Sequence, residues 1–303
     1  MSDASVDLSG RTIGIVGLGL MGAPMAKQLR THGAALRVWN RSAEKASALA
    51  SGNDSVTVCA TPAEAAQGTT ATIVMVTDAN AVEEVVFNAE SGAARGLPQD
   101  GLLIDMGTTS VLRTRGFADR LRAAGGEWLD APVSGGTVAA EAGELTIMAG
   151  GSDAAFFRAL PLFQAMGKRI THVGAIGAGQ IAKSANQMIV GLTIGAVAEA
   201  FALARHAGVE PAKIREALFG GFAHSRILEL HGERMVSRDY APRAKCSIQR
   251  KDVAEAIQLA ESVGLELPGL QANLKLWDHM VNNGMADLDH SALLLAIDPD
   301  SAA

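Results

Sequence analysis

One lysine lies in a helical segment that is otherwise almost uncharged. Lys183 follows three closely spaced glycines in GAIGAGQIAKSANQ, residues 174–187. An ammonium group in such surroundings can stabilise an oxygen atom that is gaining negative charge, and it can also donate a proton to that oxygen. Asn186 and Gln187 come three and four residues later, so a helix would bring both amides to the same side as Lys183. The alternative is a lysine whose ammonium lies in water.

A second group of residues is suited to binding phosphate. Three glycines have the G-x-G-x-x-G spacing in IGIVGLGLMGAPMA, between a predicted strand at 12–16 and a predicted helix. They permit a tight turn, close approach of a pyrophosphate to the backbone, and close packing of helix on strand. The pattern predicts a dinucleotide site with the phosphates at the helix N-terminus. The residues predicted to line it are Gly17, Leu18, Gly19, Leu20, Met21 and Gly22.

The end of the second predicted strand, VWNRS, indicates which dinucleotide binds. NAD-binding proteins usually carry an acidic residue here for the ribose 2′-hydroxyl. Asn40 brings no charge, whereas Arg41 and Ser42 can hydrogen-bond to a 2′-phosphate. We therefore predict NADP, with NAD less favoured. The alternative for Arg41 is an ordinary solvated surface charge.

The two halves of the chain differ in pattern. From Arg11 to about Val173, short apolar runs alternate with Ala-rich helical segments, which predicts parallel strands with crossover helices. After Gly179 only helical patterns follow. We predict a doubly wound, mostly parallel α/β Rossmann domain over residues 1–175, joined by a long helix to an all-α domain over residues 176–303. The predicted helices span 21–32, 79–87, 111–124, 153–165, 179–207, 211–220, 225–237, 248–263 and 267–283.

The composition excludes several classes of protein. A net charge of −6 and the lack of any Lys/Arg run argue against a nucleic-acid surface. The polar N-terminus and only two cysteines, Cys59 and Cys246, predict a cytoplasmic location. No H-x-x-x-H pair occurs among the seven histidines, which predicts no metal site, although His224 and His290 could lie near the active site.

The apolar stretch from Met188 to Leu203 raises the question of a membrane span. It contains only Thr193 and Glu199 as clearly polar side chains. We take it to be shorter than a spanning helix requires, and its glycines and alanines suit close packing in a protein core. The prediction is a core helix and no membrane association.

Four motifs in order along the chain resemble those of the β-hydroxyacid dehydrogenase family. They are GLGLMGAPMAKQL, DAPVSGG at residues 130–136, GAIGAGQIAKSANQ, and KDVAEA from Lys251. The resemblance covers essentially the whole chain. It implies a Rossmann domain followed by a helical domain, assembly into a homodimer or homotetramer, and reversible hydride transfer between NADPH and a small carboxylate-bearing semialdehyde or hydroxyacid.

The same resemblance assigns the substrate side of the site. Lys183 becomes the catalytic proton donor. The family often has Lys-x-x-Asn-Asn, so Gln187 departs from the pattern and leaves open whether Asn186 or Gln187 contacts the substrate. The acid group of the substrate would be bound by a hydroxyl and by exposed backbone N–H groups. These belong to Ser134, Gly135 and Gly136.

The cofactor side is assigned in the same way. IDMGTTS places Thr108 near the cofactor, although Gly107 replaces the serine usual in the family. Lys251 corresponds to a family lysine that lies over the cofactor; an exposed helix charge is the alternative. Met75 and Val76 end a strand at the ligand-binding edge of the sheet, where their backbone can line the cofactor.

Three further segments bear on the substrate: GGFAHS at 220–225, KSANQ, and DHSAL at 289–293. They are most similar to the tartronate semialdehyde reductase branch, whose members reduce 2-hydroxy-3-oxopropanoate to glycerate. A 3-hydroxyisobutyrate dehydrogenase, or a reductase of succinic semialdehyde or glyoxylate-type substrates, is the alternative within the family. A non-catalytic NADP-binding module is the alternative from another class, and such a protein would be expected to lose Lys183.

Overall fold

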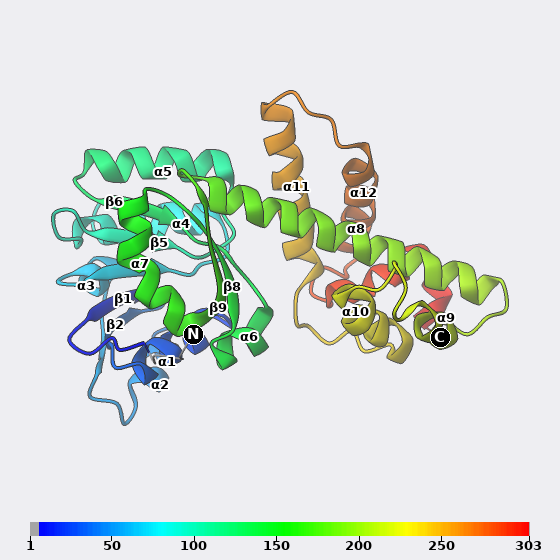
Figure 1. Ribbon diagram of the computed structural model, residues 1–303, viewed down its shortest axis with the longest axis horizontal. Coiled ribbons are helices and arrows are strands. Elements are labelled where there is room, and N and C mark those ends of the chain that lie inside the picture. Colours follow the sequence, from blue (N-terminus) through cyan, green and yellow to red (C-terminus); the bar gives the residue numbers. More distant parts are fainter. Residues whose placement is uncertain (1–5, 303) are drawn as a thin grey trace. The chain divides into compact units, whose positions relative to one another are not determined.

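The computed structural model describes residues 6–302, and the chain divides into two compact units between Lys183 and Ser184 (Figure 1). This division lies inside a helix, and the predicted domain boundary at residue 175 stays a prediction. The strands are β1 (Thr12–Val16), β2 (Ala35–Trp39), β3 (Val56–Val58), β4 (Ala71–Val74), β5 (Leu102–Asp105), β6 (Glu127–Asp130), β7 (Val133–Ser134), β8 (Leu145–Gly150) and β9 (Gly167–Gly174).

The helices of the first unit alternate with these strands. They are α1 (Gly22–Thr31), α2 (Ala43–Ala50), α3 (Pro62–Ala66), α4 (Ala79–Phe87), α5 (Val111–Ala123), α6 (Gly136–Ala142) and α7 (Asp153–Met166). Side-chain caps begin several of them: Asp78 accepts hydrogen bonds from Asn80 N and Ala81 N at the start of α4, and Ser152 accepts one from Ala155 N at the start of α7.

The sheet has the strand order β3-β2-β1-β4-β5-β6-β8-β7, with β9 paired to β8. The first six strands are parallel, whereas β8 runs antiparallel to β6 and β7. The order 3-2-1-4-5-6 is that of a dinucleotide-binding Rossmann sheet, in which ligands bind outside the carboxyl ends of the strands. The predicted mostly parallel α/β architecture is confirmed.

Both faces of the sheet are buried, so its strands are apolar at consecutive positions. In β5, Leu102 and Ile104 belong to a core that includes residues of α1, α2 and α7, whereas Leu103 belongs to a second core with residues of α3, α4 and α5. Side chains alternate between the faces along a strand, and two helix layers cover them (Figure 1). This architecture holds the strand ends in fixed positions.

The second unit is helical. Most of α8 (Ala178–His206) belongs to it, and its core is centred on Trp277, Phe201 and Met280. Its other elements are α9 (Pro211–Leu218), α10 (Arg226–Ser237), α11 (Cys246–Ser262), α12 (Pro268–Asn282), the 3-10 helix η2 (His290–Leu293), α13 (Leu294–Ile297) and the 3-10 helix η3 (Pro299–Ala302). An all-helical second half with a long first helix is therefore confirmed.

The length argument against a membrane span was wrong. Helix α8 has 29 residues and is long and apolar enough to cross a bilayer by length and composition. One side of the helix packs within the second unit, and 44% of its apolar window is buried. A Cβ at Gly191 would lie 2.7 Å from Gln249 Nε2, and one at Gly195 would lie 2.7 Å from Asn273 Nδ2. These glycines thus let α11 and α12 approach α8 closely, as the glycine content had indicated.

Candidate active site

The three glycines after β1 have three different environments. Gly17 has φ 103°, and a Cβ there would lie 2.3 Å from the Met75 carbonyl oxygen. A Cβ at Gly22 would lie 2.0 Å from the Gly17 carbonyl oxygen, whereas a Cβ at Gly19 would have no atom of residues 6–302 within 4 Å apart from Gly19 and its chain neighbours. The loop is therefore closed against the sheet and open at Gly19. Since α1 also has no acidic residue in its first turn, this environment fits a pyrophosphate.

The side chain of Asn40 is bound within the protein. Its Oδ1 accepts a hydrogen bond from Leu18 N at 2.8 Å, and its Nδ2 donates to Ser42 O at 2.9 Å. The Leu18 N–H is thus used internally, while the Leu20 side chain is 75% exposed. Arg41 is exposed on the loop that follows β2, which leaves its guanidinium accessible to a phosphate.

Two further segments follow strands at the carboxyl edge of the sheet. Met75 and Val76 follow β4, and the segment Gly107–Thr109 follows β5. A Cβ at Gly107 would lie 2.8 Å from the Val76 carbonyl oxygen, so glycine allows these two segments to approach closely. Thr108 is half-buried in the second segment.

Gln180 connects the segment after β5 to the start of α8. Its Oε1 accepts a hydrogen bond from Thr109 N at 3.1 Å, and its Nε2 donates to Gly107 O at 2.9 Å. Both groups of one amide are therefore used to hold the residues on either side of Thr108. Gln180 is 1% exposed, so these hydrogen bonds are shielded from water.

Asp130, at the end of β6, holds the same helix end by a carboxylate. Its Oδ1 accepts a hydrogen bond from Gly177 N at 2.7 Å, and its Oδ2 accepts one from Gln180 N at 2.9 Å. The side chain is fully buried, and burial raises its pKa to about 6, although the backbone N–H groups of Gly177 and Gln180 act in the opposite direction. A carboxylate at this position also complements the positive end of the helix dipole.

The predicted acid-binding residues follow directly in the chain. Ser134 ends β7, Gly135 has φ 130°, and Gly136 has φ 67° at the start of α6. Residues that carry a side chain rarely adopt these backbone conformations. The two glycines therefore allow a turn in which the backbone itself is accessible. Apart from Gly136, its chain neighbours and the backbone of its own helix, no atom of the described residues lies within 4 Å of the Cβ position of Gly136.

Lys183 lies on α8, three residues after Gln180, and is 8% exposed. The alternative of an ammonium extended into water does not agree with this burial. Since Gln180 and Asp130 fix the first turn of α8, they also fix the point from which the Lys183 side chain starts.

The other predicted residues belong to the second unit. The Nδ2 of Asn186 donates to Gln187 Oε1 at 2.8 Å, and Gln187 Nε2 donates to Asp252 Oδ2 at 2.6 Å. Gln187 Nε2 also lies 3.3 Å from Gln249 Oε1. Lys251 Nζ lies 3.0 Å from the other carboxylate oxygen of Asp252. Asp252 is 3% exposed, so the network depends on a buried carboxylate.

Four residues of these networks had no predicted role: Asp130, Gln180, Gln249 and Asp252. Three of them lie inside motifs that the sequence had already singled out, DAPVSGG, GAIGAGQIAKSANQ and KDVAEA. An acidic residue at the end of a buried strand was the available signal for Asp130, because a carboxylate there requires hydrogen-bond donors. Nothing in the sequence pairs it with Gly177, 47 residues away.

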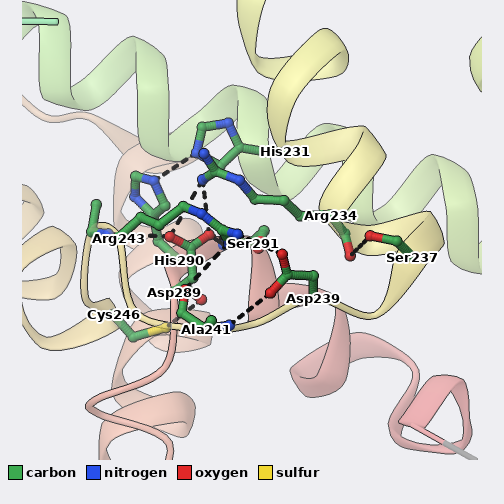
Figure 2. A network of polar contacts seen from close by, with 11 residues as sticks. His231, Arg234, Ser237, Asp239, Ala241, Arg243, Cys246, Asp289, His290 and Ser291 are labelled. Atoms are coloured by element: carbon green, nitrogen blue, oxygen red, sulfur yellow. Dashed lines mark hydrogen bonds and ion pairs between the residues drawn. The ribbon is translucent and has the colours of Figure 1, made fainter. Parts of the chain in front are cut away.

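A separate cluster in the second unit has the composition of a metal site. One ligand atom each from His231, Asp289 and His290 lies within 4.8 Å of the others. Figure 2 shows that Arg234 and Ser291 also point at this carboxylate. Arg234 Nη1 lies 3.2 Å from Asp289 Oδ1, and Ser291 Oγ donates to that oxygen at 2.7 Å.

Hydrogen bonds join the residues of this cluster to one another and to neighbouring groups. Asp289 Oδ2 accepts from Ala244 N at 3.1 Å, so protein donors occupy both oxygens. The two imidazoles contact each other, with 2.6 Å between their Nε2 atoms. His290 is thus a core residue. His224 Nε2 instead lies 2.9 Å from Glu229 Oε1 on α10.

Comparisons with known proteins identify the family. The model "NAD binding domain of 6-phosphogluconate dehydrogenase" matches residues 12–174, and "NAD-binding of NADP-dependent 3-hydroxyisobutyrate dehydrogenase" matches residues 177–297. The chain belongs to the 3-hydroxyisobutyrate dehydrogenase family. It is therefore an NAD(P)-dependent oxidoreductase of the β-hydroxyacid dehydrogenase type, as the four motifs had indicated.

Individual members of the family match along nearly their whole length. The chain is 42% identical to 2-hydroxy-3-oxopropionate reductase of Escherichia coli, over 94% of this chain and 97% of that protein. It is 34% identical to a probable 3-hydroxyisobutyrate dehydrogenase-like protein of Arabidopsis thaliana, over 96% and 86%. The crystal structure of 3-hydroxyisobutyrate dehydrogenase from Salmonella typhimurium superposes with a TM-score of 0.85 at 30% identity, over 94% and 99%.

Proposed function

We propose that this chain reduces tartronate semialdehyde to glycerate with NADPH, and that Lys183 protonates the reacting oxygen. The observation that carries the proposal is a buried lysine on a helix whose first turn is held at the cofactor edge of the sheet by Asp130 and Gln180. The 42% identity to the Escherichia coli 2-hydroxy-3-oxopropionate reductase supports this substrate.

Each role follows from the chemistry of the group. When bound, the nicotinamide supplies a hydride to the carbonyl carbon. The Lys183 ammonium neutralises the oxygen as it becomes negative and transfers a proton to it. Ser134, Gly135 and Gly136 bind the carboxylate by a hydroxyl and backbone N–H groups, which orients the carbonyl without adding another cation.

The preference for NADPH has its own support. Asn40 takes the position of the acidic residue that binds a 2′-hydroxyl, and both ends of its amide are bound within the protein. Arg41 is exposed beside it, and its guanidinium can form charge-assisted hydrogen bonds with a 2′-phosphate.

Replacing Lys183 by alanine tests the proposal. We expect kcat with tartronate semialdehyde to fall by about 10²- to 10⁴-fold, because the general acid is removed. The Kd of NADPH should not change, since the lysine acts on the substrate oxygen. Stopped-flow turnover and fluorescence titration measure the two quantities. Lys168→Ala, which removes an exposed ammonium of the same unit, is the control; equal kcat in both variants would refute the role.

A substrate panel separates the competing functions. Tartronate semialdehyde should give a higher kcat/KM than succinic semialdehyde, glyoxylate or the aldehyde whose reduction gives 3-hydroxyisobutyrate. Highest turnover with one of the others would assign the chain to that branch. NADPH binding without turnover of any member would indicate the binding module.

We also propose a homo-oligomer. Exposed apolar side chains lie on the second unit, among them Ile189 at 67% and Leu203 at 72% exposed on α8, and Val263 at 69% after α11. Burying such residues against a second copy would remove apolar surface from water. Sedimentation equilibrium distinguishes a dimer from a tetramer.

A further inference from the structure

Three side chains are joined in series by hydrogen bonds, beginning at a buried carboxylate and ending on α8. Asp252 accepts from Gln187 at one oxygen, and Gln187 accepts from Asn186. Gln249 supports the middle member, because its Nε2 donates to the backbone oxygen of Gln187 at 2.9 Å. All of these groups lie within the second unit.

The carboxylate determines how both amides are oriented. An ionised carboxylate can only accept hydrogen bonds, so Gln187 must turn its NH₂ group towards Asp252. The Oε1 of Gln187 then faces Asn186, which must in turn present its own NH₂ group. Both ends of the Gln187 side chain are occupied, whereas the Oδ1 of Asn186 accepts no hydrogen bond from residues 6–302. The last side chain of the series, Asn186, therefore ends in a hydrogen-bond acceptor, its Oδ1.

We propose that Asp252 is a positioning residue that presents the Asn186 Oδ1 as an acceptor to the substrate. Because this group accepts, it selects substrates that carry a hydroxyl beside the reacting carbonyl, as tartronate semialdehyde does. Asn186 lies three residues after the proposed proton donor Lys183 on the same helix, which brings the two to one side of it. Gln187 then acts through Asn186 and not on the substrate. This inference rests on the proposed function.

Binding of two product acids tests the selection without turnover. Glycerate carries the 2-hydroxyl and 3-hydroxypropanoate lacks it, and neither reacts in the NADPH-loaded enzyme. Calorimetric titration gives the two Kd values. We expect glycerate to bind more tightly in the wild type, and Asp252→Asn to reduce that preference by about tenfold, the effect of losing one neutral hydrogen bond. An asparagine can donate as well as accept, so it no longer determines the orientation of Gln187.

Glu255→Gln is the matched control. Glu255 Oε2 also lies near the Lys251 ammonium, at 3.6 Å, so this variant weakens the ion pairing of Lys251 and leaves Gln187 and Asn186 in place. It should keep the preference for glycerate. Asn186→Ala should lose as much of the preference as Asp252→Asn, and the double variant should lose no more. Gln187→Leu interrupts the same chain if Asp252→Asn does not fold.

The outcomes separate the two proposals. Equal weakening of both acids in Asp252→Asn, or an unchanged preference, would overturn the positioning role. A wild type that prefers glycerate, loses this preference in Asp252→Asn and yet does not reduce tartronate semialdehyde would overturn the proposed function alone.

Discussion

At the scale of single residues, the cofactor proposal depends on Arg41. Arg41→Ala should raise the KM for NADPH by about 10- to 100-fold, because a charge-assisted hydrogen bond to the phosphate is lost. The KM for NADH should stay nearly constant. Lys45→Ala removes another exposed cation from the following helix, α2, and should affect neither. Steady-state kinetics with both cofactors measure the ratio; an unchanged ratio in Arg41→Ala would mean that the arginine is only a surface charge.

Residue types and local spacing could be predicted well, but their partners could not. The space around Gly17, Gly19 and Gly22 agrees with the structural roles predicted for them from the motif, because the conformation of a turn is determined by its own few residues. Asp252 had no predicted role, although it lies in the motif KDVAEA. Its hydrogen bond to Gln187 joins residues 65 apart, and only the packing of α11 on α8 brings them together.

At the scale of elements, the start of α8 depends on Asp130. Asp130→Asn should lower kcat by about 10- to 100-fold, because an amide cannot accept from both backbone N–H groups through two equivalent oxygens and the displaced helix moves Lys183. The Kd of NADPH should not change. Measuring kcat and Kd in parallel tests this, and a loss of NADPH binding as large as the loss of kcat would contradict it.

The raised pKa of Asp130 predicts that kcat depends on pH. Its pKa is raised to about 6, so the carboxylate becomes protonated as the pH falls through 6 and loses acceptor capacity. Wild-type kcat should fall below pH 6, and Asp130→Asn should lack that part of the profile. A profile with the same acid limb in both proteins would assign it to another group.

Element bounds were predicted to within a few residues where the helices are long, as for α4 and α5. Strands β3 and β7 were missed. They have three and two residues, too few for a periodic pattern, and they form because neighbouring strands offer hydrogen-bonding partners.

At the scale of the whole molecule, the His231–His290 pair should make stability depend on pH. Burial lowers the pKa of both histidines, and one ring must donate to the other through Nε2. Arg234 opposes a positive charge on either ring, whereas Asp289 favours one. Both rings are neutral in the folded protein, but the unfolded chain binds protons below pH 6.5. Stability is therefore complete above that pH and is lost as the pH falls, by up to about 1.4 kcal/mol per pH unit for each histidine.

Urea denaturation between pH 7 and 4.5 measures this slope. His231→Leu should reduce it, whereas His279→Leu, which removes an exposed histidine of α12, should not. Asp130 acts in the opposite direction, because its folded-state pKa is raised and its protonation favours the folded state in the same range. The difference between variant and wild type isolates the histidine contribution; equal slopes would contradict it.

The continuity of α8 also limits how the gene can vary in length. Gln180, Lys183 and Asn186 follow one another at intervals of three residues along an unbroken helix. Every residue adds a rotation of about 100°, so one codon inserted or deleted between Lys183 and Asn186 would turn the Asn186 amide away from the lysine, and one between Gln180 and Lys183 would turn the lysine away from the side of Gln180. We therefore expect natural insertions and deletions to occur in surface loops and never in residues 180–186.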